Sequence, residues 1–169
     1  MFFVNEAAPL RWKLFVLDLP GGELKVYFSP AGIGRLVLPG CSLDPQDELL
    51  YTVEKPPWPG LEEELQAYFQ GREIRGNYPL LAGAYAPWTL KVLQLTAAIP
   101  FGETRTYGEI ARAAGKPRGA RAAGRALGRN CTPLLIPCHR VIGQGNKLVG
   151  FGSGLAWKEK LLALEGHNF

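Results

Sequence analysis

The sequence predicts two small structural units, an α/β unit followed by a mainly helical unit that carries a helix-turn-helix. Three observations support this: the first forty residues have strand character, helical patterns dominate from Trp88 onward, and the charge changes sign between the halves. Residues 1–84 contain 7 Lys and Arg against 11 Asp and Glu, whereas residues 85–169 contain 12 against 4. A basic half of this kind favours an anionic partner, and a solvated basic face is the simpler alternative.

The composition is that of a folded protein, with 169 residues of which 47% are hydrophobic. No apolar run reaches the roughly 18 residues that span a bilayer, and the first ten residues do not resemble a signal peptide. Three cysteines, Cys41, Cys131 and Cys138, are too few and too odd in number for a disulfide framework. We therefore expect a cytoplasmic protein (nuclear if the source is eukaryotic) that makes no membrane contact.

The first forty residues predict β-structure, because three apolar-rich runs are separated by Gly and Pro turns. These runs cover residues 12–19, 23–30 and 31–40. Leu24, Val26 and Phe28 alternate along the second run, as in a strand with one buried face. An antiparallel meander is therefore expected, followed by a loop over residues 39–60, which are rich in Pro and acidic residues.

A helix is predicted within residues 59–71, with Pro59 near its start, acidic residues in its first turn and Gly71 at its end. Its apolar stripe consists of Leu61, Leu65, Tyr68 and Phe69. Residues 71–87 contain several Gly and Pro residues, and we place the boundary between the two units there.

The second half begins with a helical pattern from Trp88 that stops at Pro100. Thr106 and Glu109 have the spacing of a capping box, which predicts a helix over residues 107–114. A Gly-containing turn and a second short helix within residues 120–130 follow, which fits a helix-turn-helix or an ordinary helical pair. The second helix carries a basic stripe of Arg121, Arg125 and Arg129.

The last helix is predicted within residues 153–166, with Ser153 as its N-cap and Gly166 at its end. Its expected buried side consists of Leu155, Trp157, Leu161 and Leu162. Glu165 lies at the C-terminal end, where the helix dipole disfavours a carboxylate. This placement indicates that Glu165 has a cationic or hydrogen-bonding partner.

The stretch LLIPCHRVIG places Cys138 directly beside His139 within an apolar run. A cysteine attacks as the thiolate, which a nearby imidazole can generate by taking the proton, and a carboxylate can orient that imidazole. Cys138, His139 and Glu165 supply these three groups, with a bridging water expected because sequence neighbours usually point in different directions. The alternative is a buried, inert cysteine beside a structural histidine.

Three segments resemble one known family, the O6-alkylguanine-DNA alkyltransferases, also called methylated-DNA–protein-cysteine methyltransferases. IPCHRVIG is similar to the active-site motif of that family, IPFGETRTYGEIARAAGKPRGARAAGRALGRN to its helix-turn-helix, and LAWKEKLLALEG to its closing helix. The order and spacing of the segments agree over residues 88–166. One departure is Phe151, which stands where many members carry Tyr.

The resemblance implies a ribonuclease-H-like subdomain over residues 1–84 and a winged-helix-like subdomain with the DNA-binding and active-site residues over 85–169. It implies irreversible, single-turnover transfer of an alkyl group from O6-alkylguanine in double-stranded DNA, with O4-alkylthymine left open as a second substrate. A monomer without a cofactor is expected. Family members with a structural zinc use Cys and His of the N-terminal half, where only Cys41 is present, so we expect no metal.

The resemblance also implies individual roles. Cys138 would accept the alkyl group, His139 would deprotonate it through water, and Glu165 would orient His139. Tyr107 would donate a proton toward the guanine, and Asn130 would be the hinge between the recognition helix and the active-site segment. Arg121 would enter the duplex from the minor groove and fill the gap left by the flipped nucleotide. The other expected DNA contacts are Ala120, Ala122, Ala123, Gly124 and Arg125, and the expected base pocket consists of Tyr107, Val141, Phe151, Gly152 and Ser153.

Three other functions share some of these features. A DNA-binding regulator that senses alkylation through Cys138 usually carries extra domains. A Cys–His hydrolase would need an oxyanion hole, and it would not explain the basic helix-turn-helix. A non-catalytic lesion binder related to the family would lack the cysteine, whereas Cys138 is present.

Overall fold

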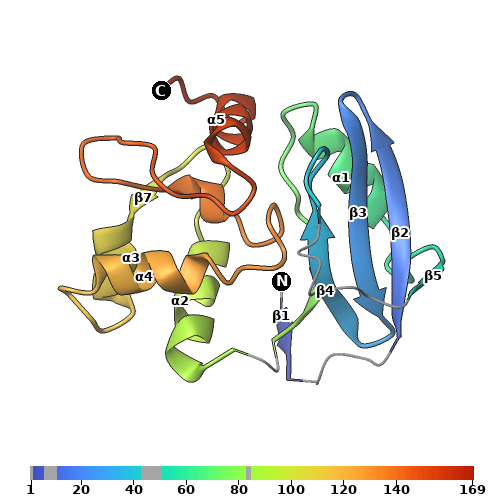
Figure 1. Ribbon diagram of the computed structural model, residues 1–169, viewed down its shortest axis with the longest axis horizontal. Helices are drawn as coiled ribbons and strands as arrows, with labels where there is room; N and C mark the ends of the chain where they lie inside the picture. Colours follow the sequence, from blue (N-terminus) through green and yellow to red (C-terminus); the bar gives the residue numbers. More distant parts are fainter. Residues whose placement is uncertain (1, 6–10, 43–50, 83–84) are drawn as a thin grey trace. The chain divides into compact units, whose positions relative to one another are not determined.

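The computed structural model describes residues 2–5, 11–42, 51–82 and 85–169. The chain divides into two compact units, Met1–Ala84 and Tyr85–Phe169, and each is described by itself (Figure 1). None of the helices within the described ranges is long and apolar enough to cross a bilayer.

The first unit contains a six-stranded mixed sheet with the strand order β1-β6-β4-β3-β2-β5. Its strands are β1 (Phe2–Val4), β2 (Trp12–Leu19), β3 (Gly22–Ser29), β4 (Gly32–Val37), β5 (Tyr51–Val53) and β6 (Pro79–Leu81). The predicted antiparallel meander is confirmed as β2, β3 and β4. The prediction of a loop over residues 39–60 is wrong at β5, which pairs in parallel with β2. Within that predicted loop, residues 43–50 lie outside the described residues.

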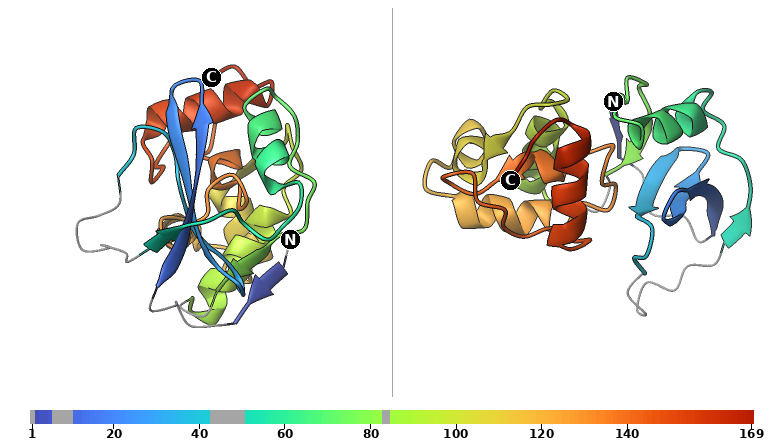
Figure 2. Two further views of the ribbon diagram at one scale, coloured as in Figure 1. Left: turned by 90° about the vertical axis from the view of Figure 1, so that its right-hand side faces the viewer. Right: turned by 90° about the horizontal axis from the view of Figure 1, so that it is seen from above.

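Helix α1 (Leu61–Tyr68) lies along one face of this sheet (Figures 1 and 2). The predicted apolar stripe is confirmed for Leu61, Leu65 and Tyr68, which are fully buried. The chain enters α1 through Gly60, whose positive φ of 84° favours glycine over any residue with a Cβ. The unit therefore has a sheet-and-helix core, as the α/β prediction required.

The second unit is mainly helical, as predicted, and contains one small parallel sheet. Its elements are α2 (Pro87–Ala97), β7 (Arg105–Thr106), α3 (Tyr107–Ala113), α4 (Ala120–Leu127), the 3₁₀ turn η2 (Cys138–Arg140), β8 (Val141–Ile142) and α5 (Leu155–Leu164). Helices α3 and α4 pack against each other and against α2, while α5 contacts η2. The β7–β8 pair was not predicted, because two-residue strands carry no periodic signal.

The predicted capping box at the start of α3 is present. The backbone N–H of Glu109 donates to Thr106 Oγ1 at 3.2 Å, and the backbone N–H of Thr106 donates to the Glu109 carboxylate at 2.7 Å. The box makes Tyr107 the first residue of α3. The capping box therefore fixes the position of Tyr107 at the start of α3.

Two expectations about α5 are wrong. The residue at its N-cap is Gly154, with φ 90°, and no side chain caps the helix, so Ser153 lies one residue too early. Leu155 is 48% exposed, and the buried face carries two charged residues together with the two leucines. That face consists of Lys158, Leu161, Leu162 and Glu165, which follow the i, i+3, i+4, i+7 spacing of one helix side.

Candidate active site

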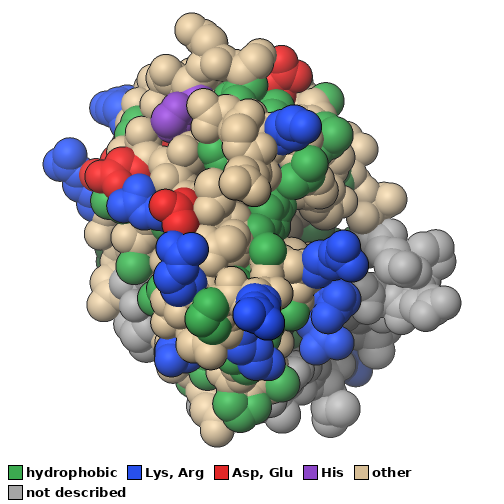
Figure 3. Space-filling model, turned by 90° about the vertical axis from the view of Figure 1, so that its left-hand side faces the viewer, with side chains coloured by type: hydrophobic (Ala, Val, Ile, Leu, Met, Phe, Trp, Pro, Cys, Tyr) green, Lys and Arg blue, Asp and Glu red, His purple; other side chains and the backbone are tan. Residues whose placement is uncertain are grey.

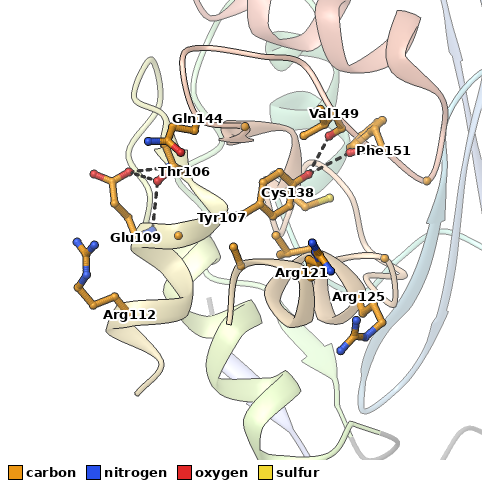
Figure 4. A pocket seen from close by; sticks show the side chains of 18 residues that line it. Thr106, Tyr107, Glu109, Arg112, Arg121, Arg125, Cys138, Gln144, Val149 and Phe151 are labelled. Atoms are coloured by element: carbon orange, nitrogen blue, oxygen red, sulfur yellow. Dashed lines mark hydrogen bonds between the residues drawn. The ribbon is translucent and has the colours of Figure 1, made fainter. Parts of the chain in front are cut away.

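A pocket of about 1050 Å³ opens in the second unit, and Cys138 is one of the residues that line it. The start of α3 contributes Tyr107, and α4 contributes Arg121 and Arg125 (Figure 4). The segment over residues 143–152 closes another side with the exposed Val149 and with Phe151. Helices α3 and α4 and the cysteine segment therefore contribute to a single cavity.

Cys138 begins the η2 turn and is 9% exposed. Burial raises the pKa of its thiol, and the hydrogen bond from Asn130 and the nearby charge of Lys158 oppose this rise. Because the net direction is upward, the thiol is mostly protonated at neutral pH. A base that takes the proton is therefore needed if Cys138 is to act as a nucleophile.

His139 and Glu165 form the predicted pair, with His139 Nε2 at 2.8 Å from Glu165 Oε1 and both side chains fully buried. Burial lowers the pKa of the His139 ring, and the hydrogen bond to Glu165 opposes that effect. The ring is therefore neutral at pH 7 and able to accept a proton. Since Glu165 holds Nε2, the nitrogen left for proton uptake is Nδ1, which is also buried.

The position of Glu165 at the helix C-terminus is explained by its partners. Arg140 donates from Nε to Oε2 at 2.8 Å and from an NH2 nitrogen to Oε1 at 2.9 Å, a bidentate pair. The backbone N–H of Gly102 donates to Oε2 at 3.2 Å. The other Arg140 nitrogen donates to the carbonyl of Ile99 at 2.6 Å. The carboxylate that orients His139 is thus itself held in place by a guanidinium.

Asn130, three residues after α4, contacts the active-site segment through its side chain. Its Nδ2 donates to the Ile136 carbonyl at 2.9 Å and to Cys138 Sγ at 3.0 Å. Its Oδ1 accepts from the backbone N–H of Thr132 at 3.0 Å. One amide therefore connects the end of the second helix to the backbone before Cys138 and to the sulfur itself.

Tyr107 lies close to Cys138 at the pocket (Figure 4). Its hydroxyl donates to the carbonyl of Val149 at 2.9 Å and lies 3.2 Å from that of Gly150. Burial and then the proximity of Cys138 raise the pKa of Tyr107 to about 12. The phenol is therefore protonated at neutral pH, and in this structure its proton is donated to the Val149 carbonyl.

The expected contact residues Ala123, Val141 and Ser153 do not line the pocket. Ala123 is fully buried and packs inside the unit, so its side chain cannot meet DNA. Val141 is also fully buried and does not line the pocket, because the parallel pairing of β8 with β7 turns it into the core. Ser153 lies outside the pocket lining. The remaining members of the two expected sets that line the pocket are Tyr107, Ala120, Arg121, Gly124, Arg125, Phe151 and Gly152.

Sequence reasoning missed two buried cations, Arg140 and Lys158. Arg140 directly follows the Cys-His pair. Lys158 occupies the buried stripe of α5, three residues before Leu161, where an apolar residue is the norm. A lysine at such a position was the available signal, since a charge is buried only when it is paired or well hydrogen-bonded.

The surface beside the pocket is basic. Figure 3 shows Lys and Arg side chains gathered on one face, with Asp and Glu confined to its upper part. The exposed basic residues of the α3–α4 region are Arg112, Lys116, Arg118, Arg121, Arg125 and Arg129. Within the described ranges, no group of three His, Cys, Asp or Glu residues is arranged to hold a metal ion.

Comparison with known proteins identifies the family. Residues 87–167 match the family model described as the DNA-binding domain of 6-O-methylguanine DNA methyltransferase. The constitutive methylated-DNA–protein-cysteine methyltransferase of Bacillus subtilis is 38% identical over 88% of this chain and 92% of its own length. A methylated-DNA–protein-cysteine methyltransferase from Methanosarcina acetivorans is 48% identical over 61% of this chain. The chain covers 65% of the length of that relative.

The solved structures agree. The crystal structure of Mycobacterium tuberculosis OGT in complex with DNA is 34% identical, with a TM-score of 0.78 over 90% of this chain and 92% of that one. The chain belongs to the methylated-DNA–protein-cysteine methyltransferase family.

Proposed function

We propose that this protein repairs DNA by direct reversal of damage, moving the alkyl group of O6-alkylguanine onto its own Cys138. The observation that carries the proposal is the position of Cys138 at the wall of a pocket large enough to admit a base, with a neutral His139 held by a buried carboxylate. A transferred alkyl group forms a thioether. A thioether has no carbonyl for water to attack, so each molecule acts once.

His139 takes the thiol proton through a bridging water, and Glu165 stabilises the imidazolium that results. The thiolate then forms the S–C bond as the C–O6 bond breaks, and the electron pair of that bond stays on the guanine. Tyr107 donates a proton to the departing base, which makes the guanine a better leaving group. No cofactor takes part in this sequence.

The partner in this proposal is double-stranded DNA, and the crystal structure of the Mycobacterium tuberculosis relative is a complex with DNA. We place α4 in the minor groove, where Ala122 and Gly124 allow close approach and Arg121 fills the space of the flipped nucleotide. Extrusion of the base costs a few kcal/mol, and least for a weakly paired lesion. In this proposal the protein acts as a monomer, with a ribonuclease-H-like first unit and a winged-helix-like second unit.

The test is the intact mass of the protein after it is mixed with duplex DNA that contains O6-methylguanine. The wild type should gain about 14 Da, the mass of one CH₂ group, once per molecule and at Cys138. Cys138→Ala should gain nothing, whereas Cys131→Ala should behave as the wild type. DNA binding without any adduct would contradict the transferase function.

Replacing Arg125 by Ala should weaken binding to undamaged duplex DNA. Each phosphate contact that is lost should make the slope of log K against log salt shallower by about 0.9. Arg125 is exposed and lines the pocket, so the loss should not disturb folding. Fluorescence anisotropy across a salt series measures the slope, and Arg75→Ala, exposed in the first unit, is the matched control. An unchanged slope would remove Arg125 from the DNA interface.

A further inference from the structure

Lys158 is a fully buried lysine whose ammonium points at the active site. Its Nζ donates to the carbonyl of Val141 at 2.6 Å and to that of Val149 at 2.9 Å. It also lies 3.3 Å from the hydroxyl oxygen of Tyr107, to which it donates. A buried ammonium is costly unless hydrogen bonds satisfy it. These bonds satisfy it, and one of them reaches the proton donor of the proposed reaction.

The two groups in this contact differ in acidity. Burial raises the pKa of Tyr107 to about 12, whereas burial lowers the pKa of Lys158 to about 8. A phenol with so high a pKa is a weak acid on its own, while the neighbouring ammonium is a better one. Because the Tyr107 oxygen already accepts a hydrogen bond from Lys158, a proton that leaves the phenol can be replaced from the lysine without rearrangement.

We propose that Lys158 supplies, through the Tyr107 hydroxyl, the proton that the guanine takes up when its alkyl group leaves. This inference rests on the proposed alkyl transfer. Lys158 is a positioning residue in this scheme, since it acts through Tyr107.

The step balances. As the thiolate forms the S–C bond and the C–O6 bond breaks, the Tyr107 proton moves to the guanine and a Lys158 proton moves to the Tyr107 oxygen. One positive charge on Lys158 and one negative charge on Cys138 disappear together. The products are the thioether, neutral guanine, an intact phenol and a neutral amine, which regains a proton from solvent afterwards.

The charges around Lys158 couple its proton loss to the reaction. The groups that face it are the Tyr107 hydroxyl, the Cys138 sulfur and the His139 ring. The negative charge of a Cys138 thiolate holds the proton on Lys158, since this interaction raises the pKa of the lysine. Alkylation removes that charge. The ammonium therefore becomes more acidic at the moment when the guanine needs a proton.

The experiment measures single-turnover rates of transfer from O6-methylguanine DNA in the wild type and in five variants, one of which is Tyr107→Phe alone. Lys158→Met should be slower than the wild type by about 10²-fold, the usual range for loss of an acid. Lys158→Arg should be nearly as slow, because a guanidinium keeps the charge and the hydrogen bonds but does not release a proton. In a Tyr107→Phe background, adding Lys158→Met should lower the transfer rate by less than about threefold. Lys160→Met, on the exposed side of α5, is the control and should react as the wild type.

The pH profile distinguishes a role of Lys158 as a proton source from a purely structural role of its hydrogen bonds. The rate advantage of the wild type over Lys158→Met should shrink about tenfold per pH unit above about pH 8, as the lysine loses its proton. Full activity of Lys158→Arg, or an equal loss from Lys158→Met with and without Tyr107, would overturn the relay. If Lys158→Met does not fold, Lys158→Arg alone decides. No Cys138 adduct in the wild type would instead refute the proposed function itself.

Discussion

Glu165→Gln is expected to lower the free energy of unfolding by about 3–5 kcal/mol, the usual cost of removing one partner from a buried ion pair. Both oxygens of Glu165 are occupied, by the bidentate guanidinium of Arg140, by His139 and by a backbone N–H. The substitution leaves the Arg140 charge buried without a counter-charge. Chemical denaturation of the wild type and the variant measures the change as a shift of the midpoint.

The matched control is Glu159→Gln, which removes a carboxylate from an exposed position on the same helix. Its midpoint should stay within the error of the wild type. The double variant Arg140→Met with Glu165→Gln should lose less than the sum of the single losses, because neither charge then stays buried alone. A Glu165→Gln midpoint equal to that of the wild type would show that Arg140 does not depend on this carboxylate.

Asn130→Ala is expected to slow alkyl transfer by about 10–100-fold at neutral pH, since a hydrogen bond to a charged group contributes roughly 1.5–3 kcal/mol. The amide donates to the Cys138 sulfur at 3.0 Å and so lowers the pKa of the thiol, against the effect of burial. Without this donor the thiolate becomes harder to form. Single-turnover rates across a pH series should show the loss shrinking at alkaline pH, where the thiol ionises in both proteins.

Asn168→Ala, at an exposed position near the C-terminus, serves as the control and should react as the wild type. Asn130 also donates to the Ile136 carbonyl, so the melting temperature of the variant has to be compared as well. A rate loss that is the same at every pH would mean that Asn130 positions the segment and does not stabilise the thiolate. An unchanged rate would remove it from the active site.

The two networks meet at the Cys138–Arg140 turn. One of them, from Asn130, reaches the sulfur, and the other, from Arg140 and Glu165, lies behind the histidine. Neighbouring side chains of this turn therefore lie in different environments. Cys138 lines the pocket, and His139 is fully buried. This arrangement explains how a thiol and an imidazole that are adjacent in sequence can hold separate roles.

Features that depend on local chemistry were predictable from the sequence. The capping box at Thr106, the meander of β2 to β4 and the stripe of α1 follow from spacing, turn residues and periodicity within a few residues of each other. The unusual carboxylate at the end of α5 indicated a partner for Glu165, and the structure supplies three: Arg140, His139 and the backbone N–H of Gly102. These features could be predicted because each depends on residues close together in the sequence, or on one residue of a type that is unusual at its position.

Tertiary structure alone decided how Ala123 and Val141 are oriented and which residues close the pocket. The resemblance implied a DNA contact for Ala123 and a place in the base pocket for Val141, but packing buries both side chains in the core. Strand β5 forms only because β2 offers an edge far away in the chain. Burial of the charge of Lys158 or of Arg140 is costly unless that charge is paired or hydrogen-bonded. Only partners brought from distant segments, the carbonyls around Lys158 and the Glu165 carboxylate, make their burial favourable, and no local pattern specifies those partners.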